Sequence, residues 1–491
     1  MAEMPKIVRV DGRPRLLVDG KPFLILGLQW ACESCFSKKE MNPLFAEAAR
    51  MGANTAVLPL YWREIEPEPD RFDFAMLDER LAQCRKNGLR LVLLWFATWK
   101  NAHHGYAPDY IQNDPQRFPL ALNREGKPAG KGSLCPSSEV TWQRDRQALV
   151  AVMEHLRRVD EERTVILFQV ENEPGIMGSD RCYCPTCEAK FRAGGYEARF
   201  GPRAAEAFSV VSIATYIDRL AAEAKAVYPL PMYQNVWLAT FGGMPGRNYP
   251  SGGAVQHMLG LALEHTKHLD LLGPDIYMHG YRQFHSLCQT YATANNPLYI
   301  VEHSSSPTGR AERNVFYAIG QHGAIGFDPW AIDSPFPERD VPPPVDPIGQ
   351  EWAPQAYALR DSYVAIGRAI QPIVEAQGTD RLFTFVQEPG ETWAGWAAKG
   401  CDLVIHYISR EGAGRGMAIQ LGENEFLLLG TGFRVTFQRP YPDGTPRREK
   451  SVVKGEYVGD RWVPLHLMEG KHAYFLEPGV ARVELEPEGG C

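Results

Sequence analysis

Apolar residues gather in short continuous runs along the first two thirds of the chain, and segments with helical periodicity separate these runs. The runs predict eight strands, at Phe23–Gln29, Thr55–Tyr61, Arg90–Ala97, Thr164–Asn172, Met232–Leu238, Leu269–Tyr277, Leu298–His303 and Ala324–Ile332. Helices are predicted between or after them, at Lys39–Met51, Ala75–Asn87, Glu139–Val159, Arg203–Val227, Ala311–His322 and Gln355–Gln377. Strands that are apolar throughout are typical of a parallel sheet that helices cover on its outside.

Eight alternating units in this length predict an α/β fold, a (β/α)8 TIM barrel, over residues 23–378. An open doubly wound sheet is the alternative. That fold would place a glycine-rich phosphate loop after the first strand, and the segment Gly27-Leu-Gln-Trp30 is not such a loop.

Shorter segments flank the predicted barrel. Residues 6–22 alternate and turn at Gly12 and Gly20, which predicts an N-terminal β-hairpin within residues 1–22. After Gly378 the pattern changes to short strands with glycine turns, which predicts a smaller all-β, sandwich-like domain at 379–491. Its predicted strands are Leu382–Gln387, Trp393–Ala397, Asp402–Ile408, Met417–Gln420, Glu425–Leu429 and Arg434–Gln438. A proline-rich stretch at 333–347 predicts a long loop at the barrel rim.

Two glutamates follow buried strands at the ends where barrels carry their chemistry. Glu173 comes after the fourth strand, preceded by Asn172, and Glu302 ends the seventh. Paired carboxyl groups suit glycoside cleavage, with Glu173 as acid/base and Glu302 as nucleophile. Asn172 is placed to bond the sugar 2-hydroxyl. The alternative is that both are ordinary solvated carboxylates, and Glu171, which points opposite to Asn172 by strand alternation, is interpreted as structural.

Cysteines form a second pattern. Cys182, Cys184 and Cys187 lie within six residues, and Cys135 precedes them in another rim segment. Four thiolates satisfy a closed tetrahedral Zn²⁺ site that staples loops and activates no water. Buried free thiols or a redox-active cluster are the alternatives. No organic cofactor is expected.

These residues resemble known families. The Asn-Glu pair after strand four, the glutamate ending strand seven and the segment Trp62-Arg-Glu-Ile-Glu66-Pro67 are similar to clan A retaining glycoside hydrolases. The Cys-x-Cys-x-x-Cys cluster resembles that of family 42 β-galactosidases. Segment 94–101 and the glycine-rich β domain resemble a bacterial subgroup of family 35 β-galactosidases. The family 42 resemblance implies a homo-oligomer, often a trimer.

Further side chains at strand ends are predicted to bind substrate. Trp330 is a candidate platform under the sugar, with core packing as its alternative, and the Tyr277 hydroxyl is placed to bond Glu302. Trp99 and Asn101 complete the predicted substrate-binding set. Asp275 and His303 are interpreted evenly as cleft or supporting residues.

The net charge of the chain limits the binding partners that it is expected to have. The net charge of −7 without a basic run argues against nucleic acid and anionic membranes. The N-terminus has no apolar leader and no stretch approaches the ~20 apolar residues that span a bilayer, so a cytoplasmic location is expected.

Together the sequence predicts a retaining exo-β-glycosidase acting on a β-linked oligosaccharide or glycoside, with β-galactosidase as the first choice. Specificity for glucose, mannose, fucose or arabinose is one alternative. A barrel that binds carbohydrate without cutting it is the other.

Overall fold

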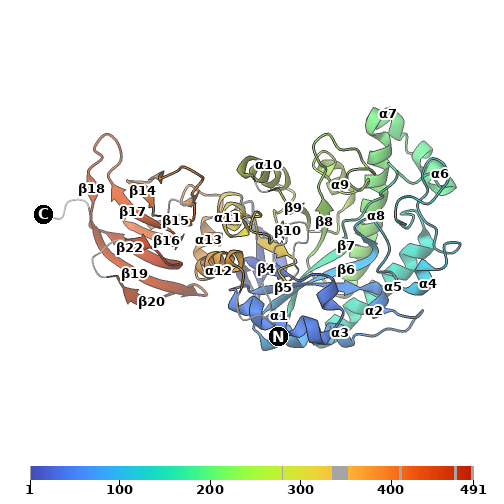
Figure 1. Ribbon diagram of the computed structural model, residues 1–491, viewed down its shortest axis with the longest axis horizontal. Coiled ribbons are helices and arrows are strands. Elements are labelled where there is room, and N and C mark those ends of the chain that lie inside the picture. The colour runs from blue at the N-terminus through green and yellow to red at the C-terminus, as the bar shows by residue number, and fades with distance from the viewer. Residues whose placement is uncertain (1, 279, 334–351, 409–411, 469–472, 488–491) are drawn as a thin grey trace.

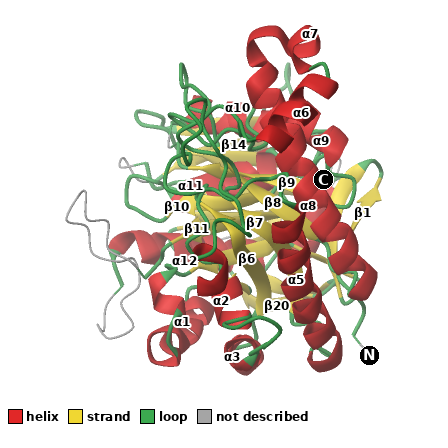
Figure 2. Cartoon of the chain, turned by 90° about the vertical axis from the view of Figure 1, so that its right-hand side faces the viewer, coloured by secondary structure: helices red, strands yellow, loops and turns green. Residues whose placement is uncertain are grey.

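The structure is a computed structural model that describes residues 2–278, 280–333, 352–408, 412–468 and 473–487. Eight parallel strands close into a barrel inside a ring of helices, which confirms the predicted fold class (Figure 2). The barrel strands are β4 (Ile25–Gln29), β5 (Thr55–Tyr61), β6 (Arg90–Lys100), β7 (Val165–Asn172), β8 (Met232–Trp237), β9 (Leu271–Ile276), β10 (Ile300–Ser304) and β11 (Gly326–Trp330). Pairing of β11 with β4 closes the barrel.

Most helices lie where the apolar periodicity predicts them, and two begin at serine caps. The Ser37 and Ser138 hydroxyls accept the backbone N–H of Glu40 and Thr141, each at 3.3 Å. The helices of the barrel region are α1 (Lys38–Arg50), α2 (Trp62–Ile65), α3 (Ala75–Lys86), α4 (Asp109–Gln112), α5 (Glu139–Val159), α6 (Pro185–Ala193), α7 (Tyr196–Phe200), α8 (Ala204–Val227), α9 (Leu259–His265), α10 (Tyr281–Tyr291), α11 (Ala311–Phe316), α12 (Pro354–Gly367) and α13 (Ile370–Ala376).

Two predicted helices are interrupted. The segment predicted at 311–322 is α11 followed by a π-helical turn at Tyr317–Gln321. The segment predicted at 355–377 breaks between α12 and α13. Pro372 explains this break, because its ring would clash with the carbonyl of Arg368 in a continuous helix.

The N-terminal segment has one strand more than the predicted hairpin. β1 (Lys6–Val10), β2 (Arg13–Val18) and β3 (Lys21–Phe23) form an antiparallel meander. Asp19 and Gly20 both have positive φ, as a two-residue turn of type I′ requires. Because β3 pairs with β2, the first barrel strand begins at Ile25 and not at Phe23.

The C-terminal region consists of two packed antiparallel sheets, as predicted for an all-β domain (Figure 1). One contains β12 (Leu382–Val386), β15 (Arg415–Gly422), β16 (Glu425–Thr431), β22 (Gly479–Leu485), β19 (Glu449–Val458) and β20 (Arg461–Leu467). The other contains β13 (Trp393–Ala398), β14 (Cys401–Tyr407), β17 (Phe433–Gln438), β18 (Pro446–Arg447) and β21 (Tyr474–Phe475). The strands after residue 440 were not predicted, because charged side chains interrupt the apolar pattern of β19 and a proline lies inside β20.

One apolar cluster joins the two regions, and the β region has a second buried cluster of its own. Met417, Leu427 and Val480 of the six-stranded sheet belong to the same buried cluster as the barrel. Polar contacts cross the same joint: the Arg415 guanidinium donates to the Ser362 hydroxyl on α12 at 2.8 Å. We propose that residues 1–22, 23–378 and 379–491 are three parts of the chain that differ in strand topology. Most of the predicted proline-rich loop, and Cys491, lie outside the described residues.

Candidate active site

Three carboxyl groups meet at the C-terminal mouth of the barrel. Glu173 directly follows β7, Asp275 lies on β9 and Glu302 lies on β10. One oxygen atom of each lies within 4.8 Å of the others, and all three side chains are buried. The two glutamates predicted as a pair are therefore side by side, and an aspartate joins them.

Glu302 is surrounded by hydrogen-bond donors. The Tyr277 hydroxyl donates to Oε2 at 2.7 Å, as the sequence predicts. The side-chain amides of Asn235 and Asn172 approach Oε1 at 3.4 and 3.5 Å. These three donors fix the orientation of the Glu302 carboxyl group at the barrel mouth.

Glu173 has a different environment. Its backbone has a φ of 44°, and its N–H donates to the Asn235 side-chain oxygen at 2.7 Å. The Asn101 amide donates to Oε2. Burial and the charge of Glu302 raise the pKa of Glu173 to about 7, although Lys100 acts in the opposite direction. A carboxyl group with this pKa holds or releases a proton near neutral pH.

Asp275 lies between the two glutamates. Burial, reinforced by the charges of Glu302 and Glu173, raises its pKa well above the ordinary range. The Asn235 amide donates to its Oδ2 at 3.1 Å, and a hydrogen bond also links Asp275 with Glu173. The environment of Asp275 therefore favours its protonated form.

Lys100, the last residue of β6, brings a cation to this site. Burial favours the neutral amine, but Cys32, Glu173 and Glu302 outweigh that effect and the pKa of Lys100 is raised. Its Nζ lies 4.9 Å from the centre of the Phe96 ring. The ammonium is positioned to offset part of the negative charge of the carboxyl cluster.

Of the predicted substrate-binding residues, Asn172, Asn101 and Tyr277 contact the two glutamates. The Tyr277 ring is 36% exposed although its hydroxyl is occupied by Glu302. Trp330 ends β11 and is half-buried. Strand alternation gives it the same direction as Asp328, which is fully buried and accepts a hydrogen bond from the Tyr299 hydroxyl. Its contact with a sugar stays a prediction.

The prediction for Trp99 needs correction. This side chain is fully buried, and its ring packs edge-on against Tyr216 of α8, with centroids 4.9 Å apart. It therefore faces the helical layer and not the barrel mouth. The reason is an irregularity in β6, whose register against β7 shifts between Trp95 and Lys100 and so changes the simple alternation of side chains.

Asn235 was missed from the sequence, although it contacts all three carboxyl-bearing residues. The only signal is a polar pair, Gln234-Asn235, inside an otherwise apolar strand. The sequence left open whether Asp275 and His303 lie in the cleft or support it, and the structure places Asp275 in the cleft. His303 is fully buried, and Asn314 of α11 contacts its ring at 3.0 Å, so it supports the barrel wall.

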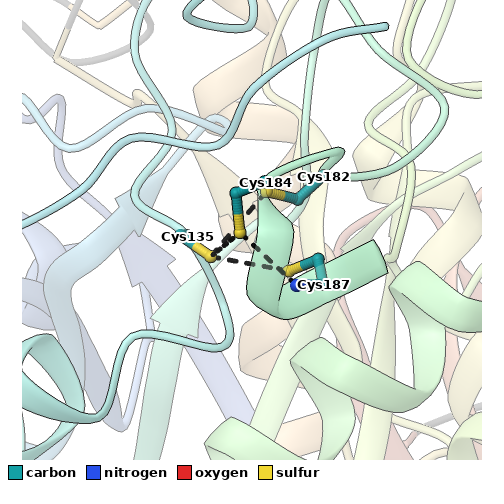
Figure 3. A group of neighbouring side chains, drawn as sticks. All are labelled: Cys135, Cys182, Cys184 and Cys187. Atoms are coloured by element: carbon teal, nitrogen blue, oxygen red, sulfur yellow. Dashed lines mark hydrogen bonds between the residues drawn. The ribbon is translucent and has the colours of Figure 1, made fainter. Parts of the chain in front are cut away.

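The four predicted cysteines form one cluster (Figure 3). Sulfur–sulfur distances from Cys135 are 3.6 Å to Cys187 and 3.7 Å to both Cys182 and Cys184. A disulfide would require about 2.05 Å. Four sulfurs about 2.3 Å from one tetrahedral ion lie about 3.8 Å apart, so the cluster is a possible metal site.

Part of the barrel sequence matches a known family of glycoside hydrolases. Residues 39–198 match the family model Glyco_hydro_42, described as Beta-galactosidase. The predicted resemblance to family 42 β-galactosidases is thus confirmed, whereas the family 35 features stay a prediction. Residues 359–475, which begin within α12 and include α13 and most of the β region, match a domain of unknown function, DUF5597.

The similarity to individual relatives extends over only part of each protein. Beta-galactosidase BgaA of Thermus sp and Beta-galactosidase of Thermus thermophilus are each 32% identical over 145 residues, which is 28% of this chain and 20% of the relative. The chain therefore matches about a fifth of these relatives. The structure of β-galactosidase from Bacillus circulans sp. alkalophilus superposes with a TM-score of 0.55 and 15% identity, over 72% of this chain and 57% of that one. At that identity it supports the fold alone.

Within the described ranges, no helix combines the length and the apolar character that crossing a membrane requires.

Proposed function

We propose that this protein is a retaining, exo-acting β-galactosidase. The observation that carries the proposal is the short separation of Glu173 and Glu302, whose nearest oxygens lie within 4.8 Å across the barrel mouth. Retaining glycosidases hold their two carboxyl groups about 5–5.5 Å apart, whereas inverting ones need about 6.5–9.5 Å to admit a water molecule. The titration of Glu173 near neutral pH supports its part as acid/base.

In the first step Glu302 attacks the anomeric carbon and forms a glycosyl-enzyme while Glu173 protonates the leaving oxygen. The donors on Glu302, above all the Tyr277 hydroxyl, hold its carboxyl group in a fixed orientation. Once Glu302 is esterified its negative charge is lost, so the proton affinity of Glu173 falls. Glu173 is then suited to take a proton from the incoming water in the second step.

Lys100 and Asp275 adjust this exchange. Lys100 lowers the pKa of Glu173 through its positive charge, and Asp275 lowers it through a hydrogen bond. Asn172, with its amide on Glu302, is retained as the partner of the sugar 2-hydroxyl. Trp330 is retained as the platform under the sugar.

Galactose is chosen because the matched family model and the curated relatives carry that name. The test is turnover of nitrophenyl β-glycosides of galactose, glucose, mannose, fucose and arabinose, with product anomers followed by NMR. We expect the galactoside to turn over fastest and to give the β-anomer first. An α-anomer as first product contradicts the mechanism, faster turnover of another sugar contradicts the specificity, and sugar binding without turnover supports a carbohydrate-binding barrel.

The cysteine cluster is proposed to hold one structural Zn²⁺ per chain through Cys135, Cys182, Cys184 and Cys187. The donor set and sulfur spacing fit four-coordinate zinc. With all four positions filled by protein, the ion contributes folding energy and leaves the reaction to the carboxyl groups. The ion would fasten the loop after β7 to the segment that contains Cys135. A homotrimer and a cytoplasmic location remain proposals from the family resemblance and the sequence.

Metal analysis of the purified protein tests this site. We expect about one zinc per chain, and chelation should lower the melting temperature because binding energy to a structural metal appears as folding energy. Replacing Cys184 with serine should have the same effect. Replacing Cys401, in the β region, is the matched control that should leave zinc content unchanged. Metal-free protein with an unchanged melting temperature would contradict the site.

A further inference from the structure

A second pair of carboxyl groups lies behind the active site, on the outer side of the barrel wall. Glu171 of β7 and Asp145 of α5 are fully buried and hydrogen-bonded to each other. Asp145 also receives the Trp95 indole N–H at 2.9 Å, the Thr98 hydroxyl at 2.8 Å and the Tyr216 hydroxyl at 3.0 Å. None of these groups takes part in the mechanism above.

The pair shares one proton. Two buried carboxyl groups in contact cannot both ionise. Three donors converge on Asp145, which marks it as the carboxylate, and Glu171 as its proton donor. Burial raises the pKa of both groups, but the hydrogen bonds that Asp145 receives lower its pKa, whereas the charge of Asp145 raises that of Glu171 further, well above its ordinary range. The groups facing the pair are uncharged donors: Trp95 and Thr98 from β6 and Tyr216 from α8.

Glu171 holds β6 where its register fails. Its Oε2 accepts the Trp99 N–H at 2.7 Å and its Oε1 accepts the Thr98 N–H at 3.3 Å. Both lie within the register shift between Trp95 and Lys100, where the regular ladder with β7 is interrupted. The glutamate side chain thus replaces backbone partners that the ladder does not supply.

The next residues of β6 lead directly to the acid/base. Lys100 follows Trp99, and Asn101 donates to Glu173 through its side chain and to the Asn172 carbonyl through its backbone, at 3.2 Å. The backbone here is strained: Asn101, Glu171 and Glu173 all have positive φ, a conformation that non-glycine residues adopt only where surrounding contacts hold it.

We propose that Asp145 and Glu171 are positioning residues, which hold the ends of β6 and β7 so that Lys100 and Asn101 stay directed at Glu173. The inference rests on the proposed function. In this arrangement protonated Glu171, bonded to ionised Asp145, holds the outer side of the barrel wall in place without a positively charged side chain. The inner face keeps Lys100 as the cation that acts on Glu173.

The test replaces Glu171 with leucine and with glutamine. Leucine leaves the Thr98 and Trp99 N–H groups and Asp145 without their partner. Glutamine retains an acceptor for the N–H groups and a donor for Asp145. Tyr216→Phe is the matched control, because it removes the hydrogen bonds of its hydroxyl with Asp145 and Thr98 from the same pocket and leaves the bonds of Glu171 to the β6 backbone intact.

Two measurements separate positioning from stability. The first is the titration of Glu173, followed by ¹³C-carboxyl NMR and assigned with Glu173→Gln. In Glu171→Leu it should move to higher pH, because Lys100 is released from its place near Glu173. The second is turnover of an alkyl β-galactoside against the dinitrophenyl β-galactoside, where the alkyl substrate should lose at least about tenfold more because it depends on acid help. Glu171→Gln should restore both values.

The outcomes are distinct. A lower melting temperature in Glu171→Leu with an unchanged Glu173 titration overturns the positioning role, and so does a Tyr216→Phe variant that shifts the titration equally. If the leucine variant does not fold, Asp145→Asn is measured in the same way, and an unshifted Glu173 titration there also overturns the proposal. Failure of the proposed function would instead show as an unmodified protein that turns over no glycoside, while the NMR titration still reports on positioning.

Discussion

The end of β7 carries two glutamates, two residues apart, which the barrel wall places in opposite environments. Glu173 faces the mouth, near the cation of Lys100 and the carboxyl groups of Glu302 and Asp275. Glu171 faces the helices, and Asp145 is its charged partner. Both pKa values are raised by burial, but that of Glu173 reaches only about 7. The comparison shows why only Glu173 is suited to exchange protons at neutral pH: it lies on the inner side of the barrel wall, where Lys100 lowers its pKa.

Glu302→Gln should break the inner site most completely. Without a carboxylate to form the glycosyl-enzyme, turnover should fall ~10³-fold or more, about 4 kcal/mol of barrier, while the fold persists. Steady-state kinetics on a nitrophenyl galactoside measure the loss. Glu154→Gln, on the exposed face of α5, is the control. Retention of normal activity in Glu302→Gln removes the residue from its assigned role.

Glu173→Ala should divide substrates by leaving group. Dinitrophenyl galactoside needs little acid help, so its first step should survive and the intermediate should accumulate, whereas alkyl galactosides should lose about 10²–10⁴-fold. Azide should then give a β-glycosyl azide. In a Glu302→Gly variant it should give the α-anomer. The same azide anomer from both variants would contradict the division of roles.

Lys100→Met sharpens the comparison by removing the cation from the inner face. Glycosylation needs protonated Glu173, so the activity of the native protein should fall as pH rises through about 7. Lys100 lowers the pKa of Glu173, so its removal should raise that pKa and move the basic limb of the kcat/KM profile to higher pH. Lys86→Met, on the exposed face of α3, should leave the limb in place. An unshifted or lowered limb in Lys100→Met would disprove the electrostatic link.

Two tryptophans at strand ends make the smallest contrast. Trp330→Ala should lower kcat several-fold with little change in melting temperature, because stacking on a flattening sugar ring strengthens in the transition state. Trp99→Ala should instead cost about 3–5 kcal/mol of stability, as truncation of a core aromatic does. Thermal melts and kinetics on both variants decide this. A stability loss in Trp330→Ala without a kinetic defect would place Trp330 in the core as well.

The sequence predicted most of the barrel because each strand is a separate apolar run and its ends are local features. The same locality located Glu173 and Glu302, since each directly follows or ends such a run. It failed where the outcome depends on pairing across the chain. The irregular register of β6 against β7 turned Trp99 to the helices. Nothing local shows that Asn235 reaches three residues from other strands.

Patterns of period two were also incomplete guides. The edge strand β20 has exposed side chains along most of its length, so it carries little of the contrast on which strand prediction depends. By contrast, the cysteine cluster could be predicted because the spacing of Cys182, Cys184 and Cys187 is itself local. Only the membership of Cys135 required a contact across the fold.

The core that runs from the barrel into the six-stranded sheet affects how the chain unfolds. Met417, Leu427 and Val480 lie in the same apolar cluster as the barrel residues, so removing the sheet would expose both surfaces to water. Because this cluster crosses the topological boundary near residue 378, we expect the two regions to unfold together. A chain cut there would leave α11 to α13 without their cover, and the intact protein should melt with both regions in a single transition.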